Sequence, residues 1–161
     1  MRRTFKYRLY PTKKQRRLLE STLEECRWLY NNTLAYCREI WEKEKRFASW
    51  YETKRRIPRL KAERPSLATV YSSVLQDVTM RVDLAFKLFF RRLKAKNGKA
   101  GYPRFKGPGR YDSFTYPQTG FRLTENGRLH LSKIGDIRIK LHRPIEGRIK
   151  TLTIRRTATD K

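Results

Sequence analysis

The longest regular pattern of hydrophobic positions in the chain runs from Tyr71 to Lys96. Apolar side chains recur there at spacings of three and four residues, which places them on one helical face: Tyr71, Val74, Leu75, Val78, Val82, Ala85, Phe86, Phe89 and Leu93. The opposite face carries Ser72, Gln76, Asp83 and Lys87. The pattern predicts an amphipathic helix of roughly 40 Å, with Ser66 as its predicted N-cap.

A strand and a second helix are predicted in the N-terminal third. Apolar and polar residues alternate from Thr4 to Tyr10, which is typical of a half-buried strand with one basic face. Thr12 and Gln15 then form a capping box for a helix. This helix either continues to Lys45 or breaks near residues 25–28 to give a helix-turn-helix. Its two cysteines, Cys26 and Cys37, lie too far apart along the axis to pair and are expected to be buried free thiols.

Residues 47–63 predict a short, very basic helix anchored by Trp50, Ile57 and Leu60. Most of its charged residues are positive, so we expect Lys54 and Arg55 to contact phosphates.

The C-terminal third changes to a period of two residues. Strands are predicted at residues 113–116, 121–124, 128–131, 137–141 and 149–156, with a hairpin turn at Asn126-Gly127. The predicted fold is therefore α+β, a small antiparallel β-barrel with a helical insertion after its first strand. Residues 1–11 are the first strand, residues 12–98 the helical insertion, and residues 99–161 a basic loop and the remaining strands.

The charge of the chain indicates its partners. The formal net charge is +25, and self-repulsion of that size favours a polyanionic partner, nucleic acid first. No apolar stretch has transmembrane length, and no apolar signal core follows Met1, so neither a membrane partner nor secretion is expected. Cations without an intervening acid run from the end of the long helix to Asp112: Arg91, Arg92, Lys94, Lys96, Lys99, Arg104, Lys106 and Arg110.

Aromatic residues are interleaved with these cations. Tyr51, Tyr102, Phe105, Tyr111 and Phe114 are of the type that stacks on unpaired bases while cations hold phosphates. The alternative for Phe105 and Phe114 is that they belong to the hydrophobic core.

Catalytic residues are not predicted. His130 and His142 fall at outward strand positions, and the adjacent acids Glu24 and Glu25 are interpreted as charges on an exposed helix face. No metal-spaced Cys/His cluster and no phosphate-cradling glycine loop occurs. We therefore expect no catalytic residue, metal or cofactor in this chain.

Several short motifs occur in a specific order. They are Leu9-Tyr10-Pro11-Thr12-x-x-Gln15, Arg27-Trp28-x-Tyr30-Asn31, Leu75-Gln76, Ala85-Phe86-x-x-Phe89-Phe90, Gly101-Tyr102-Pro103-Arg104-Phe105-Lys106, Ser113-Phe114-Thr115, Leu129-x-Leu131-x-Lys133-Ile134-Gly135 and Gly147-x-Ile149. As a set they resemble the N-terminal half of TnpB (OrfB-type) proteins of bacterial and archaeal insertion sequences, over nearly the whole chain.

The resemblance implies a wedge-type, OB-like barrel interrupted by a helical recognition region. It implies two partners, a structured guide RNA and the duplex DNA beside the target, in the cytoplasm of a bacterium or archaeon, near the nucleoid. The DNA motif would be read by Gln76, Thr115, Ser72 and Ser73, with support from Trp50 or Tyr51. Arg104 and Lys106 would hold the backbone of the guide RNA or of its heteroduplex.

Members of this family continue into a RuvC-like nuclease that binds divalent metal, and most carry a zinc ribbon. Since the sequence stops before the first of those acids, Mg²⁺ and Zn²⁺ are expected only in the missing half, and cleavage is not expected here. Two alternatives remain. One is a stand-alone helix-turn-helix DNA-binding transposase fragment or regulator, and the other is a basic structural RNA-binding protein of ribosomal type. The oligomeric state is not predicted.

Overall fold

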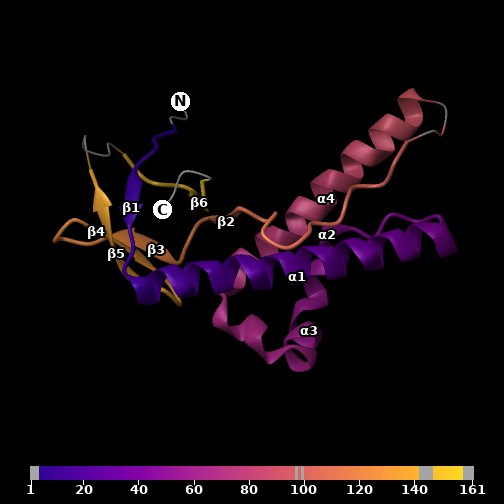
Figure 1. The fold of residues 1–161 in the computed structure, drawn as a ribbon. Helices are drawn as coiled ribbons and strands as arrows, with labels where there is room; N and C mark the ends of the chain where they lie inside the picture. The colour runs from indigo at the N-terminus through magenta and orange to yellow at the C-terminus, as the bar shows by residue number, and fades with distance from the viewer. Residues whose placement is uncertain (1–3, 97, 99, 142–146, 158–161) are drawn as a thin grey trace.

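A computed structural model describes residues 4–96, 98, 100–141 and 147–157 (Figure 1). It confirms the α+β class, with helices and antiparallel sheets in one chain. The helices are α1 (Lys13–Glu44), α2 (Trp50–Arg55), α3 (Ile57–Glu63), the 3₁₀ helix η1 (Pro65–Thr69) and α4 (Ser72–Ala95). The strands are β1 (Arg8–Tyr10), β2 (Ser113–Tyr116), β3 (Phe121–Leu123), β4 (Arg128–Leu131), β5 (Gly135–Lys140) and β6 (Leu152–Arg155).

Helix α1 is a single uninterrupted helix, so the alternative of a break near residues 25–28 does not occur. Its start is the predicted capping box: the Gln15 backbone N–H donates to Thr12 Oγ1, and the Gln15 side chain accepts from the Thr12 N–H. It ends at Lys45, whose left-handed backbone (φ 53°) still donates to the Trp41 carbonyl. At about 1.5 Å per residue, its 32 residues form a rod of about 48 Å.

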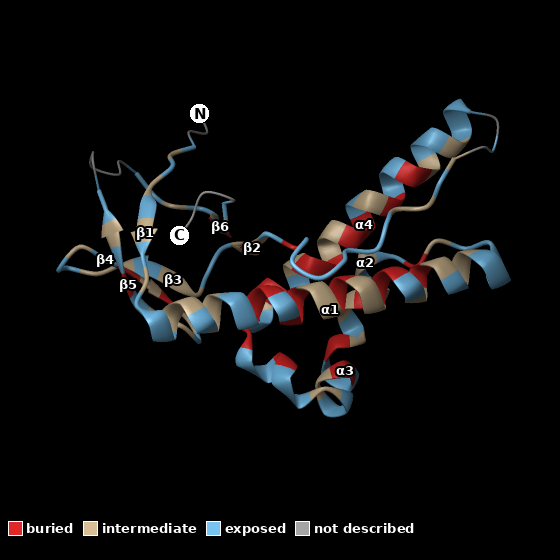
Figure 2. Ribbon diagram, viewed as in Figure 1, coloured by how far each residue is buried: buried red, intermediate tan, exposed pale blue. Residues whose placement is uncertain are grey.

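Helix α4 packs against the middle of α1, and the hydrophobic core lies between them (Figures 1 and 2). The predicted apolar stripe is the buried face: Val74, Leu75, Val78, Val82, Phe86 and Phe89 are at most 2% exposed. From α1, Cys26, Leu29 and Leu34 contribute fully buried side chains. The two cysteines are buried free thiols, as predicted.

The predicted N-cap of α4 was wrong. Ser66 lies in η1, and its hydroxyl donates to Glu25 Oε1 of α1 at 2.9 Å. Val70 and Tyr71 then adopt extended backbone (ψ 138° and 135°), so the long helix begins only at Ser72. The Ser66 hydroxyl is therefore bonded to α1, and it does not cap the long helix because the extended residues Val70 and Tyr71 separate the two.

The predicted basic helix at residues 47–63 is two short helices. Ser49 caps α2 by accepting from the Glu52 N–H. The chain turns at Arg56, and Pro58 occupies the first turn of α3, where a missing N–H costs no intrahelical bond. In Figure 1, α3 lies on the side of α1 opposite α4.

The strands form two antiparallel sheets. One has four strands in the order β1-β5-β4-β3, and the other is a two-stranded ribbon of β2 and β6. The hairpin β3–β4 with Gly127 at φ 77° confirms the predicted Asn-Gly turn, and β1 finds its partner in β5, as expected of the first strand. A closed barrel is not confirmed, because no ladder joins the two sheets among the described residues.

The four-stranded sheet lies at the N-terminal end of α1 (Figure 1). A tight aromatic contact joins the two-stranded ribbon of β2 and β6 to α4. Tyr71, at the start of α4, stacks on Tyr116 of β2 with ring centroids 5.8 Å apart. Gly120 lies against both rings with φ +93°, and a Cβ there would come within 2.5 Å of Tyr71 and 2.9 Å of Tyr116. This residue is glycine because the site has neither the backbone conformation nor the space for a side chain.

Candidate nucleic-acid interface

The predicted DNA-reading residue Gln76 lies on the polar face of α4, with its side chain exposed. Its backbone carbonyl is used: it accepts from Trp50 Nε1 of α2 at 3.2 Å and from the Thr79 hydroxyl at 2.7 Å. Trp50 Nε1 also donates to Thr79 Oγ1 at 3.1 Å. Trp50 therefore fixes α2 beside the helical turn that presents Gln76, and its indole N–H is already bonded.

The two serines lie one turn before Gln76. Ser72 is exposed and accepts from Lys61 Nζ at 3.4 Å, whereas Ser73 is half-buried. Both precede Gln76 by the four or three residues that place side chains on one helical face. Ser72, Ser73 and Gln76 thus form a continuous polar strip on α4.

Thr115 is positioned from another side of α4, through Arg81. The Arg81 guanidinium donates to Thr115 Oγ1 at 3.0 Å, to the Ser113 carbonyl at 2.8 Å and to the Tyr111 hydroxyl at 3.1 Å. It also donates to Asp77 Oδ2 at 3.2 Å. No contact joins Thr115 to the Gln76 side chain in the described residues, so the structure does not bring these two predicted readers together.

Tyr51 is the most exposed large aromatic side chain near this strip, at 62% of its surface. Lys54 Nζ lies 5.4 Å and the Arg55 guanidinium 5.3 Å from its ring centroid. Lys54 also lies 4.3 Å from the Trp50 ring. An exposed ring flanked by two cations is the arrangement that holds a base and its phosphate.

Two side chains of α1, Asn31 and Arg27, attach the basic loop to this helix. Asn31 accepts from the Lys106 N–H at 2.9 Å and donates to the Lys106 carbonyl at 2.8 Å. Arg27 donates to the same carbonyl at 3.1 Å. Because the backbone at Lys106 is held, the Arg104 and Lys106 side chains are presented to solvent from a fixed segment.

The other residues predicted to contact the nucleic-acid backbone are Arg91, Arg92, Arg110 and Lys99. Arg91 and Arg92 are exposed near the end of α4, and Arg92 donates to the Gly101 carbonyl at 3.5 Å. Arg110 is exposed at the other end of the loop. Lys99 lies outside the described residues.

A depression of about 450 Å³ opens where the loop meets α4, β2 and β6. Five cations and one acid line it, among Tyr30, Arg81, Lys106, Arg110, Tyr111, Asp112, Ser113, Arg155 and Arg156. Asp112 is engaged by Arg156 at 3.0 Å, and Arg81 is engaged by Asp77. Burial raises the pKa of the Tyr111 hydroxyl, so it stays protonated at neutral pH. The depression is therefore an excess-positive pocket suited to an anion.

The aromatic candidates divide between the core and the surface. Tyr111 and Phe114 are buried at 4% and 1% exposure, so the core alternative holds for Phe114. Phe105 is 46% exposed, and the Arg38 guanidinium lies 5.2 Å from its ring. Tyr102 is half-buried and stacks on Phe89 at 4.9 Å. Tyr51 and Phe105 are the two that remain available for stacking.

Sequence reasoning misplaced two acids. Glu25, interpreted as a surface charge, is 6% exposed and accepts from Arg64 Nε at 2.7 Å and from Ser66. Asp83, placed on the polar face of the long helix, is 5% exposed and pairs with Lys87 at 3.0 Å. The partners of Glu25 lie about 40 positions away, so helical periodicity could not have found that contact.

No three His, Cys, Asp or Glu side chains gather as a metal site within the described ranges. None of the helices there combines the length and the apolar content needed to cross a bilayer.

Comparisons with known proteins show which sequences this chain is similar to. Residues 1–46 match the helix-turn-helix domain of OrfB (IS605) proteins. In the structure, the described part of that range contains β1 and one continuous helix. The chain is 31% identical over 157 residues to "Putative RNA-guided DNA endonuclease InsQ" of Escherichia coli (strain K12), covering 93% of this chain and 36% of that protein. It is 32% identical over 149 residues to "Putative RNA-guided DNA endonuclease" of Streptomyces pristinaespiralis, covering 90% and 35%.

The structure is of mixed α and β type, and the helix-turn-helix match together with the relatives supports the class of nucleic-acid-binding modules. In sequence the chain is similar to the TnpB/OrfB type of insertion-sequence proteins. It spans about a third of the length of the curated relatives it matches.

Proposed function

We propose that this chain holds a structured guide RNA and reads a short motif in the duplex DNA beside the target. The relatives are named as RNA-guided DNA endonucleases. We assign no cleavage step to the described residues. DNA cleavage by a full-length protein is part of this proposal only because the relatives are named as endonucleases. In the same proposal the predicted barrel corresponds to the two sheets described above, and the protein acts in the cytoplasm, near the nucleoid.

The observation that carries the proposal is the polar strip on α4. Gln76 is exposed on a helix whose other face is fully packed, and α2 is bonded to the same turn through Trp50. A rigid helix with an exposed glutamine fits the major groove, where glutamine pairs with the N6 and N7 atoms of adenine. Ser72 and Ser73 extend the strip by one turn.

The backbone contacts in this proposal come from the basic loop and α2. Arg104 and Lys106 are exposed on the segment that Asn31 holds, and Lys54 and Arg55 flank the exposed Tyr51 ring. Such cations bind every sequence with similar strength, because phosphates carry no sequence information.

The test separates the two kinds of contact with a duplex DNA library randomised at a few adjacent positions. We expect Gln76→Ala to lose discrimination at one base, worth about 1–3 kcal/mol, with little change in affinity for random duplex. Arg104→Ala should weaken every duplex and a folded hairpin RNA alike. Lys43→Ala, which removes an equal charge near the end of α1, is the matched control and should bind as wild type.

Equal loss from Gln76→Ala on all library members would show that Gln76 does not read bases. Binding of duplex with no affinity for hairpin RNA would instead favour a stand-alone DNA-binding regulator. The unbroken α1 argues against that alternative, because it presents no turn between two helices within the matched domain.

A further inference from the structure

The four-stranded sheet has two very different faces. Side chains alternate along each strand, and one set is packed in the core: Leu9, Phe121, Leu129, Leu131, Ile137 and Ile139. The other set faces outward and, apart from the half-buried His130, is exposed: Arg8, Tyr10, Arg122, Arg128, Asp136, Arg138 and Lys140. We call this outward set the cationic sheet face. It contains five cations and one acid.

Like charges stand directly opposite one another across this face. The antiparallel register pairs Arg8 with Lys140 and Arg128 with Arg138. Directly opposed side chains in an antiparallel sheet lie about 4.5–5.5 Å apart at Cβ, where like charges destabilise the sheet. The free protein therefore carries a repulsion at two positions that its own fold does not relieve.

No acid on the face neutralises these cations. Asp136 is directly opposite His130, and its carboxylate lies 2.6 Å from His130 Nδ1. None of the five cations forms an ion pair with a carboxylate among the residues that the structure describes. Other arginines of the described chain, such as Arg46 and Arg64, do have carboxylate partners.

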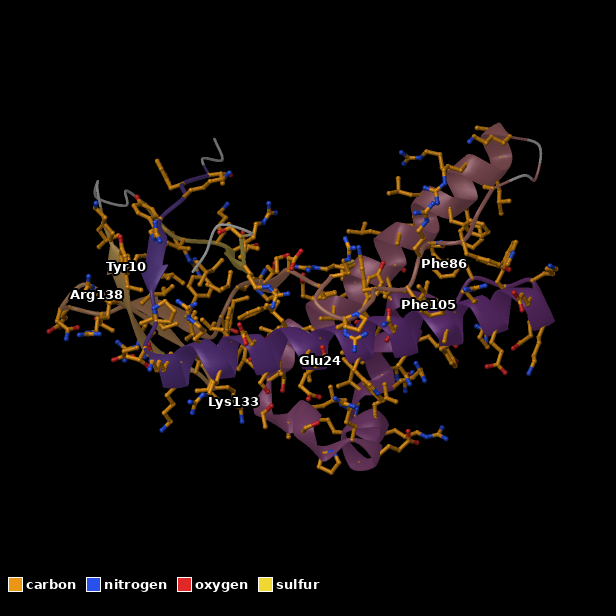
Figure 3. The ribbon with its side chains drawn as sticks, in the orientation of Figure 1. Tyr10, Glu24, Phe86, Phe105, Lys133 and Arg138 are labelled. Carbon is orange, nitrogen blue, oxygen red and sulfur yellow. The ribbon has the colours of Figure 1, made fainter. Side chains whose placement is uncertain are left out.

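Tyr10 holds two of the guanidinium groups in place. The Arg138 guanidinium lies 4.9 Å from the Tyr10 ring centroid, and that of Arg8 lies 5.6 Å from it. Figure 3 shows Tyr10 and Arg138 side by side on the sheet. A guanidinium already seated on an aromatic ring loses less freedom on binding, and its planar fork suits the oxygens of a phosphate.

The start of α1 adds a second, independent charge conflict beside the same sheet. Gln15 Nε2 donates to the Asp136 carbonyl at 2.7 Å, which fixes the first turn of α1 against β5. That turn has no acidic residue, and Lys13 and Lys14 open it. Cations at the positive end of a helix dipole are unfavourable in the free protein. Violations of local electrostatic rules on a well-formed scaffold are expected at functional surfaces.

We propose that the cationic sheet face binds the phosphodiester backbone of a nucleic acid, at a surface separate from α4 and the basic loop. Arg128, Arg138, Arg8 and Lys140 contact the phosphates, and Tyr10 positions the two arginines it touches. This inference rests on the proposed function, since it presumes that the chain binds nucleic acid. It extends that function by a second surface, at the far end of α1.

The decisive variant is Arg128→Gln, because the Arg128 side chain has no bond in the described structure and its removal relieves the repulsion with Arg138. We expect its affinity for a labelled hairpin RNA or random duplex DNA to fall about five- to tenfold at 0.1 M salt, with a salt slope lower by about 0.7–0.9. We also expect the free protein to melt about 1–3 °C higher. A residue with a merely structural role would not show opposite signs in binding and stability.

Lys43→Gln is the matched control. It removes one exposed charge that is paired with Glu39 at 2.6 Å, so it should leave affinity unchanged and should not raise the melting temperature. Running RNA and duplex in separate arms shows which polymer the face prefers. Polyglutamate is the third arm, and it should compete weakly.

Each result decides between the two proposals. If wild type binds nucleic acid and Arg128→Gln binds with the same affinity and salt slope, the sheet-face proposal is wrong and the proposed function stands. If wild type binds neither RNA nor duplex, both fail. If polyglutamate competes as well as RNA, with the same loss in Arg128→Gln, the face binds acidic protein instead.

Discussion

At the scale of single residues, the structure shows that charge in this chain has two different roles. Most cations are exposed, whereas Arg64 and Arg81 are turned inward to bond specific oxygens. Arg81 joins α4 to β2, and Arg64 joins the segment before η1 to Glu25 of α1. The neighbouring acids Glu25, which is buried, and Glu24, which is exposed, allow the stability contributions of an inward and an outward ion pair to be compared.

Glu25→Ala should destabilise the protein by about 2–3 kcal/mol, because Arg64 and the Ser66 hydroxyl would both lose their buried acceptor. Urea denaturation measures the change. Glu24→Ala is the control: Glu24 is 49% exposed and paired with Arg27, so its removal should cost at most about 0.5 kcal/mol. Equal effects of the two variants would mean that Glu25 is not a buried anchor.

The two thiols give a prediction with a defined pH dependence. Burial raises the pKa of Cys26 and of Cys37 from 9.0 to about 12. A group with a raised folded pKa contributes stability that is complete below its unfolded pKa and is lost as pH rises through the folded value. We therefore expect stability to fall between pH 9 and about 12. Cys26→Ala/Cys37→Ala should reduce this slope in denaturation curves.

Alkylation provides the second measurement on these thiols. Cys26 and Cys37 are 0% and 3% exposed, so native protein at neutral pH should react with iodoacetamide only at the rate of opening. Denatured protein should react at once. Fast labelling of the native protein would contradict the placement of both residues.

At the scale of elements, local signals predicted most of the fold. The capping box at Thr12, the apolar stripe of α4 and the Asn-Gly hairpin were all read from neighbouring residues, and all are confirmed. The errors arose where distant contacts decide. Ser66 serves Glu25 of α1 instead of capping α4, and the pairing of β2 with β6 as a separate ribbon depends on neighbours far along the chain.

In the candidate site, too, local sequence patterns predicted some features, and others depend on contacts between distant residues. Gln76 and Tyr51 could be expected on an exposed surface from helical periodicity and composition, and they are exposed. The separation of Thr115 from Gln76 follows from the Arg81 contacts, which no local pattern reveals. The opposed cations of the sheet face required the strand register.

The capping box of α1 gives the element-scale prediction. Thr12→Ala removes the acceptor of the Gln15 N–H and should destabilise the protein by about 0.5–2 kcal/mol in thermal or urea unfolding. Thr12→Ser retains an acceptor oxygen at the same position, so it should stay close to wild type. A loss in Thr12→Ser as large as that in Thr12→Ala would exclude the hydroxyl as the cause.

At the scale of the whole molecule, the sheets and the helices meet at Gly120. Gly120→Ala should cost more than about 2 kcal/mol, because the new methyl group would overlap both Tyr71 and Tyr116 in a strained backbone. Gly127→Ala is the matched control. It has a similar positive φ of 77° but nothing within 4 Å, so it should show the backbone cost alone, about 1 kcal/mol. Similar losses would show that the aromatic junction is loose.

The net charge of +25 sets the behaviour of the complete chain. If about 6–10 phosphates are contacted, affinity for hairpin RNA should fall by about 10³–10⁵ between 50 and 200 mM salt. Fluorescence anisotropy across a salt series measures this slope. An affinity that is flat across the series would contradict binding through the cations of the loop, α2 and the sheet.

The unbroken α1 fixes both the distance and the relative orientation of these surfaces. Its first turn is fixed to β5 through Gln15, and its middle is fixed to the loop through Asn31, 16 residues later, so about 24 Å of helix separates the two attachments. One inserted residue between them would lengthen this spacing by only about 1.5 Å but would rotate the sheet about the helix axis by about 100°. Seven inserted residues would nearly restore the original orientation of the sheet. The angular phase of this rod, more than its length, therefore determines whether one continuous polymer can reach both ends.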